Sequence, residues 1–131
     1  MQSQKIKDYY KEKYLKKKLL KKYQEIRKDS IIHRIIESLR ARSFYYMKTF
    51  NMKHMEILGC SASELEEYLT NKFTDGMTME NFGKWEVDHI KPVSKFNLND
   101  DKEVRVCFHY TNLQPLWMTD NRSKSNKYKE E

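Results

Sequence analysis

The sequence predicts a small α+β protein with a helical first half and two short strands in its second half. Three observations predict this class. The first 50 residues contain no glycine or proline and are rich in good helix formers. Apolar residues between positions 31 and 50 recur at helical spacing, and two short apolar runs follow residue 84. At 131 residues, the chain has room for one domain with an appendage.

Charge divides the chain into two parts. Residues 1–30 hold eleven Lys and Arg against four Asp and Glu, whereas residues 31–131 hold fifteen of each, so the whole net charge of +7 lies in the first 30 residues. We call residues 1–30 the basic arm. A basic arm on a neutral body favours a polyanionic partner, because lysines release counterions when they meet phosphates. A solvated lysine-rich helix is the alternative.

The arm is expected to form a helix from Lys5 to Lys28 with a poor apolar stripe. Asp29 or Ser30 can cap a second, buried helix over residues 31–50. A third helix is expected from Ser61 to about Phe73, since Ser61 and Glu64 form an S-x-x-E capping box.

The second half is expected to contain two strands and two helices. Asp75 and Gly76 should form a turn, and residues 85–90 read as a strand that Pro92 ends. A short helix should follow Asn99 or Asp100 and run to Cys107. Residues 113–117 read as a strand that Pro115 restricts to an edge or bulge, and Thr119 can cap a last helix to about Lys127.

Four polar residues in the last 45 positions could carry chemistry: Asp88 and His89 at a strand end, Asn112 before the second strand, and Asn121 in the last helix. A phosphodiesterase needs a base for water, a hard cation for the phosphate, and a group that holds the base in the right tautomer. Carboxylate and amide oxygens suit magnesium or manganese better than zinc.

The segments WEVDHIKPVSKF, NLQPLW and DNRSKSNK resemble the HNH endonuclease family, and ILGCSASELEEYLTNKF and DGMTMENFGKWEVDHI are similar to HNH proteins of phages and large DNA viruses. The resemblance covers roughly residues 33–127. It implies an HNH domain over residues 31–131, with a helical part at 31–83 and a ββα-metal (His-Me finger) core at 84–127.

The resemblance also implies a role for each of the four residues. His89 would be the general base, Asp88 and Asn121 would bind a single Mg²⁺ or Mn²⁺, and the side-chain carbonyl of Asn112 would orient the imidazole. Cleavage would leave a 5′-phosphate and a 3′-hydroxyl. The chain has only two cysteines, Cys60 and Cys107, without a CxxC pair, so no structural zinc is expected.

Several charged residues are candidates for supporting roles. Lys124 shares a helix face with Asn121 and is expected to contact the nucleic-acid backbone; Arg122, Lys127 and Lys91 are weaker candidates. Glu86 shares a strand face with Asp88 and could support the metal ligands, although an ordinary surface role is the alternative. His109 could do the same, against a structural role at a helix end. Arg34, Arg40 and Arg42 could touch flanking duplex or be solvated.

The expected function is therefore metal-dependent hydrolysis of DNA, with duplex DNA as the partner and the basic arm supplying non-specific affinity. A catalytically silent DNA-binding module of the same fold is one alternative. An interaction protein whose arm docks on an acidic partner is another, and a ribonuclease or toxin is possible within the fold. No run of apolar residues is long enough to cross a bilayer, so no membrane partner and an intracellular location are expected.

Overall fold

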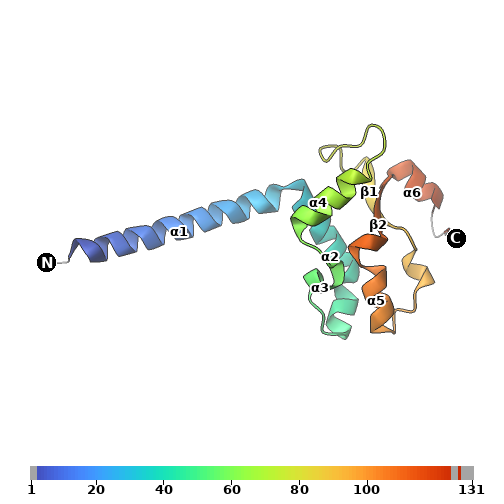
Figure 1. Ribbon diagram of the computed structural model, residues 1–131, viewed down its shortest axis with the longest axis horizontal. Coiled ribbons are helices and arrows are strands. Elements are labelled where there is room, and N and C mark those ends of the chain that lie inside the picture. The colour runs from blue at the N-terminus through green and yellow to red at the C-terminus, as the bar shows by residue number, and fades with distance from the viewer. Residues whose placement is uncertain (1–2, 125–126, 128–131) are drawn as a thin grey trace.

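The computed structural model describes residues 3–124 and 127, except for the side chains of residues 23–29. Its fold is α+β: several helices and one two-stranded antiparallel sheet (Figure 1). The elements follow the order α1 (Gln4–Asp29), α2 (Ile31–Thr49), α3 (His54–Leu58), α4 (Ala62–Asn71), β1 (Trp85–His89), η1 (Val93–Lys95), α5 (Asp101–Cys107), η2 (Tyr110–Asn112), β2 (Leu113–Trp117) and α6 (Met118–Lys124).

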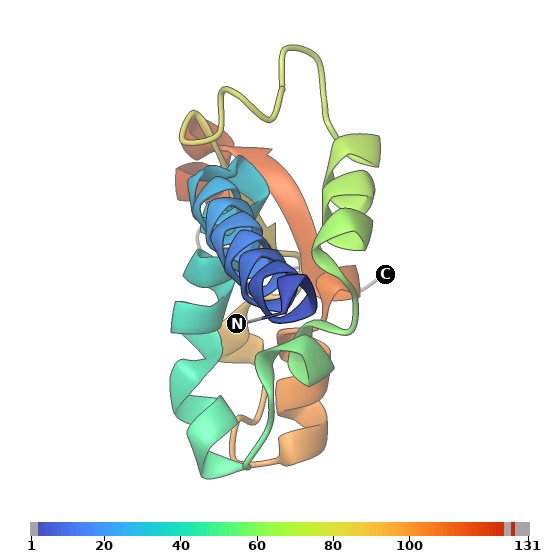
Figure 2. The same cartoon turned by 90° about the vertical axis from the view of Figure 1, so that its left-hand side faces the viewer.

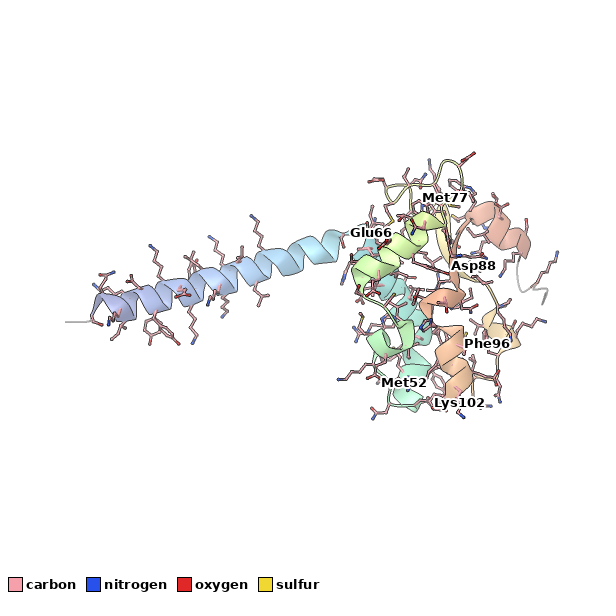
Figure 3. The ribbon with its side chains drawn as sticks, viewed as in Figure 1. Met52, Glu66, Met77, Asp88, Phe96 and Lys102 are labelled. Atoms are coloured by element: carbon pink, nitrogen blue, oxygen red, sulfur yellow. The ribbon has the colours of Figure 1, made fainter. Side chains whose placement is uncertain are left out.

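Helix α1 projects from the rest of the molecule as a rod (Figure 1). Its 26 residues extend about 39 Å at 1.5 Å per residue. All residues from 3 to 22 are exposed, and Figure 3 shows their side chains pointing outward on all sides of the helix. The helix therefore gains its order from local propensity and not from a buried face.

Capping residues fix where α2 and α4 begin. The Ser30 side chain accepts a hydrogen bond from His33 N at 3.2 Å, which confirms the predicted start of α2. The predicted capping box of α4 is also present, because Ser61 Oγ accepts from Glu64 N and Glu64 accepts from Ser61 N. Helix α4 ends at Asn71, slightly before the predicted Phe73.

Two expectations about helices were wrong. The last helix begins at Met118, directly after β2, and is not capped by Thr119; its expected end near Lys127 lies partly outside the described residues. Helix α3 was not expected at all. Its five residues, HMEIL, are too few to show a helical period, and it ends at Gly59, which has a left-handed conformation with φ of 79°.

Strands β1 and β2 pair in the register Trp85 with Trp117, Val87 with Pro115 and His89 with Leu113. Just outside the two ends of β1, Met118 N donates to Lys84 O and Ile90 N donates to Asn112 O. In an antiparallel pair, such hydrogen-bonded positions alternate with positions whose backbone N–H and C=O groups point away from the partner strand. Pro115 faces Val87 at such an outward position, so its missing N–H costs no ladder bond.

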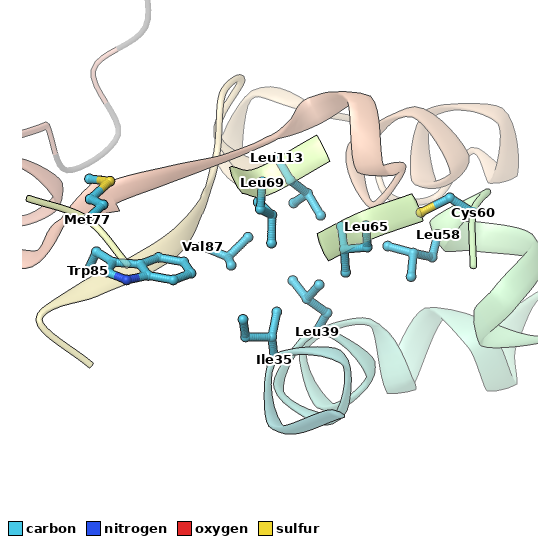
Figure 4. Packing of buried hydrophobic residues seen from close by; sticks show 10 residues of the cluster. All are labelled: Ile35, Leu39, Leu58, Cys60, Leu65, Leu69, Met77, Trp85, Val87 and Leu113. Carbon is cyan, nitrogen blue, oxygen red and sulfur yellow. The ribbon is translucent and has the colours of Figure 1, made fainter. Parts of the chain in front are cut away.

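One hydrophobic cluster joins the helical half to the sheet. Figure 4 shows Ile35 and Leu39 of α2 facing Leu65 of α4, Val87 of β1 and Leu113 of β2. Figure 2, which looks along α1, shows β2 with α2 on one side and α4 on the other. A second cluster packs α5 against the end of α2 and α3, with the members Met47, Met52, Ile57, Val104, Cys107 and Phe108. Among the described residues, no helix is both long and apolar enough to span a membrane.

Candidate active site

Strand β1 presents the predicted catalytic pair on its two opposite faces. Trp85, Val87 and His89 lie on the buried face, whereas Glu86 and Asp88 are half-buried on the other face. Helix α6 contacts both strands, and Figure 3 shows Asp88 on the side of the body where α6 lies. The strand was expected to reach Ile90 and ends one residue earlier, so the candidate base, His89, occupies the last position of β1.

The carboxylate of Asp88 is held by two residues. Lys124 Nζ of α6 lies 3.0 Å from Asp88 Oδ2 in an ion pair whose side chains are 19% and 12% exposed. Gln114 Nε2, opposite Asp88 in the sheet, donates to the same oxygen at 3.1 Å. Both contacts end on Oδ2, so among the described residues Oδ1 is the oxygen left for a further ligand.

Asn121, the other predicted ligand, is bonded to Glu86. Its Nδ2 donates to Glu86 Oε2 at 2.9 Å, across 35 positions of sequence. This bond leaves the amide carbonyl of Asn121 as the atom that could bind a cation. Glu86, for which the sequence suggested a supporting role, thus orients the side chain of Asn121.

The side chain of Asn112 forms its hydrogen bonds with backbone groups and not with the imidazole of His89. Its Oδ1 accepts from Lys91 N at 2.9 Å, and its Nδ2 donates to Lys91 O at 3.1 Å and to Cys107 O at 2.9 Å. The expectation that its carbonyl accepts from a ring N–H of His89 was therefore wrong. Lys91 follows His89 by two positions, so Asn112 fixes the backbone that leaves β1 after the candidate base.

The imidazole of His89 is buried, with 7% of the residue exposed. Its ring packs edge-on against Phe108 at 5.5 Å, and its Nε2 atom is enclosed without a hydrogen-bond partner among the described residues. Burial is the main cause that lowers the pKa of His89 from 6.5 to about 4; the charges of Arg42 and Lys124 also lower it, and the charge of Asp88 opposes them. His89 is consequently neutral at pH 7 and able to accept a proton.

This lowered pKa makes folding depend on pH. The unfolded chain takes up a proton on His89 below pH 6.5, whereas the folded chain does so only near pH 4. The contribution of His89 to the free energy of unfolding is thus complete above pH 6.5 and is lost as the pH falls toward 4, a loss on the order of 2–3 kcal/mol.

We expect urea unfolding with chelator present to show this loss in the native protein and not in His89→Gln. His54, whose pKa is also lowered by burial, is present in both proteins and cancels in the difference. Parallel curves for the two proteins between pH 7 and 4.5 would contradict the prediction.

The oxygen donors around Asp88 fit a hard cation. Within the described part of the chain, no three side chains of His, Cys, Asp or Glu come together as a metal-binding group. A cation here would therefore rest on Asp88, on the amide oxygen of Asn121 and on water, with Glu86 adjacent. Such a set suits Mg²⁺ or Mn²⁺, which keep coordinated water, better than zinc.

The remaining predicted residues take varied positions. Lys124 does not project toward an external phosphate as expected: its ammonium donates to His89 O at 2.9 Å as well as pairing with Asp88. Arg122 and Lys127 are exposed, and Lys91 Nζ lies 4.7 Å from the Phe96 ring. His109 caps η2 and its Nδ1 contacts Thr111 Oγ1 at 2.8 Å, in keeping with the structural alternative.

Sequence reasoning missed Gln114 and could not single out Arg42 among the three arginines of α2. Gln114 lies opposite Asp88, which the sheet register could have shown. Arg42 of α2 donates to Val87 O at 2.9 Å across 45 positions, and no local pattern signals such a contact.

Two curated proteins of Acanthamoeba polyphaga mimivirus are similar to this chain. The uncharacterized protein L246 is 30% identical over 104 residues, which are 78% of this chain and 46% of that protein. The uncharacterized protein L426 is 30% identical over 97 residues, 72% of this chain and 43% of its own length. This chain therefore spans less than half the length of these relatives. No protein-family model matches the chain, and no solved structure matches it.

Proposed function

We propose that this protein is a metal-dependent DNA endonuclease of the HNH class, with β1, β2 and α6 as its ββα-metal core. One observation carries the proposal: α6 brings Asn121 and Lys124 onto the face of β1 that holds Glu86 and Asp88, and His89 follows Asp88 at the end of the strand, on its other face. These residues are up to 38 positions apart, and their side chains are of the types that metal-assisted phosphodiester hydrolysis uses as ligands and base. The viral origin of both relatives supports action inside a host cell.

The chain's own side chains divide the work. A bound divalent cation supplies neutralisation of charge on the phosphate. Asp88 and the Asn121 carbonyl would hold that cation, and Glu86 fixes the orientation of the Asn121 amide by accepting from its Nδ2. Neutral His89 takes the proton of the attacking water, and Asn112 fixes the backbone that follows the base. General-base catalysis of this kind contributes about 10² to 10⁴ in rate.

A catalytically silent DNA-binding module is the second candidate, and specific contacts favour it. Lys124 already neutralises Asp88, and the imidazole of His89 is almost enclosed. Cleavage therefore requires the ammonium to leave Asp88 and the base to become accessible to water. A silent module would keep both contacts when it binds DNA.

Nicking of supercoiled plasmid separates the two candidates. The endonuclease predicts open-circular product with Mg²⁺ or Mn²⁺, none with chelator, and nicks that DNA ligase reseals because they carry a 5′-phosphate and a 3′-hydroxyl. Retardation of the plasmid without nicking in either metal would favour the silent module and overturn the proposal.

The basic arm is proposed to bind the backbone of duplex DNA. At about 100° per residue, Lys11, Lys18 and Lys22 fall within about 40° of one face of α1, and Lys5, Lys13 and Lys16 lie on the opposite side. Residues 3–22 are all exposed, so both groups are accessible. The exposed apolar residues of α1 lie around the whole helix and do not form one docking face, which argues against a helical partner.

We expect replacement of Lys11, Lys18 and Lys22 by Gln to reduce the slope of log affinity against log salt by about 2.7, from 0.9 for each phosphate contact. Replacement of Lys5, Lys13 and Lys16 removes the same charge from the other face and should change the slope less. Fluorescence anisotropy with a labelled duplex in chelator measures both. Equal slopes for the native protein and the first variant would exclude the arm from the interface.

A further inference from the structure

Two cations line the free edge of β1, the edge that faces away from β2. Arg42 Nη1 of α2 donates to Val87 O at 2.9 Å, and Lys124 Nζ of α6 donates to His89 O at 2.9 Å. Val87 and His89 are alternate residues, so the two acceptor carbonyls lie about 7 Å apart along the strand. At 3.4 Å of axis per nucleotide, this distance covers at most two nucleotides of one DNA strand.

The two cations differ in how much of each is accessible. Lys124 is largely enclosed, with 19% of its side chain exposed, and is committed to Asp88. Arg42 is exposed, and its guanidinium carries five N–H donors, of which the bond to Val87 O uses one. Arg42 therefore keeps charge and donors available at a point fixed to the strand of the candidate base.

Arg42 borders a hollow that is also lined by Glu86, the residue that is hydrogen-bonded to Asn121. This hollow has a volume of about 180 Å³ between α2 and β1, and its lining includes Arg42, Ser38, Gly83 and Glu86. A Cβ atom at Gly83 would meet no atom within 4 Å, so the hollow is open there. Glu86 accepts a hydrogen bond from Asn121, and the charge of Arg42 helps to lower the pKa of His89.

The other two arginines of α2 lack these contacts. Arg40 is exposed beside α3, where it borders the hollow of His54 and Met55 on another face of the helix. Arg34 is exposed and is not among the residues that line this hollow. Arg40 is thus a matched control, two positions from Arg42 on the same helix and with the same charge.

We propose that Arg42 is a phosphate-binding residue, which grips the DNA backbone next to the cleaved bond from a helix outside the ββα core. A planar guanidinium fits a phosphate in two-point contact, and the bond to Val87 O fixes its position relative to Asp88 and His89. Lys124 becomes a second phosphate ligand when it leaves Asp88. This inference rests on the proposed function for the identity of the ligand.

The test compares Arg42→Gln with Arg40→Gln in the full chain, in chelator, on a labelled 25-base-pair duplex. Gln removes the charge, but its amide nitrogen lies two bonds closer to the backbone than Nη1 of Arg and does not replace the bond to Val87 O, so the salt slope is the readout rather than affinity alone. We expect Arg42→Gln to lower the slope of log affinity against log salt by about 0.9. The ratio of native to variant affinity should therefore fall about 3.5-fold when salt is raised from about 50 to 200 mM. Arg42→Lys should restore the slope, and Arg40→Gln should leave it unchanged. A native slope in folded Arg42→Gln overturns the proposal.

A second measurement does not depend on the variant's folding. Phenylglyoxal labelling of the native protein, read by mass spectrometry, should show Arg42 protected by the duplex and Arg40 unprotected; equal labelling of Arg42 with and without duplex overturns the inference. The outcomes separate the two proposals. Plasmid nicking without an Arg42 effect overturns this inference alone, and an Arg42 effect without nicking overturns the endonuclease and leaves the phosphate site.

Discussion

The His89→Ala variant is expected to nick DNA about 10²- to 10⁴-fold more slowly than the native protein and still to bind Mn²⁺. His89 directly follows Asp88 in β1, and its imidazole is neutral at pH 7, the form that can take a proton from water. Its ring is not among the oxygen donors, so removing it should not remove the cation. Calorimetric titration with Mn²⁺ and single-turnover nicking measure the two properties separately.

Asp88→Ala provides the contrasting result, the loss of both metal binding and nicking. It also leaves the ammonium of Lys124 without its carboxylate in a largely enclosed position, so a lower melting temperature is expected as well. His33→Ala, on α2 and away from the site, controls for the loss of a histidine. A His89→Ala rate within threefold of the native rate would refute the assignment of the base.

Local signals in the sequence were sufficient to predict most elements and the two faces of β1 on which the candidate residues lie. Ser61 and Glu64 marked the start of α4 because a capping box acts within four residues. Alternation of apolar and polar residues in WEVDH placed Asp88 and His89 on opposite faces, and the strand has that arrangement. Such signals depend only on residues close in sequence, which a single chain displays directly.

The partners of each site residue could not be predicted in the same way. Lys124 was expected to face solvent phosphate, but α6 begins at Met118 and lies against β1, so the nearest anion is Asp88. Arg42 was one of three equivalent arginines until the packing of α2 on β1 brought it to Val87 O. Both contacts depend on how elements 35 to 45 residues apart dock, and side-chain periodicity carries no information on that.

Asn112→Ala is expected to lower the free energy of unfolding by about 2–4 kcal/mol, a large effect for a half-buried polar residue. The substitution removes three hydrogen bonds at once and leaves Lys91 N, Lys91 O and Cys107 O without them. Each bond contributes about 0.5–1.5 kcal/mol, and buried groups left unpaired cost more. The free energy follows from urea unfolding at pH 7 with chelator present.

Asn112→Asp separates hydrogen bonding from volume, because it has the size of the native side chain. Its carboxylate can accept from Lys91 N, but it turns two donors into acceptors that face the carbonyls of Lys91 and Cys107. We therefore expect it to be at least as unstable as Asn112→Ala. If the bonds to Lys91 position His89, both variants should also lose nicking at temperatures where they remain fully folded, with KM nearly unchanged. A stability within 0.5 kcal/mol of native for Asn112→Ala would show that these bonds do not hold the loop after β1.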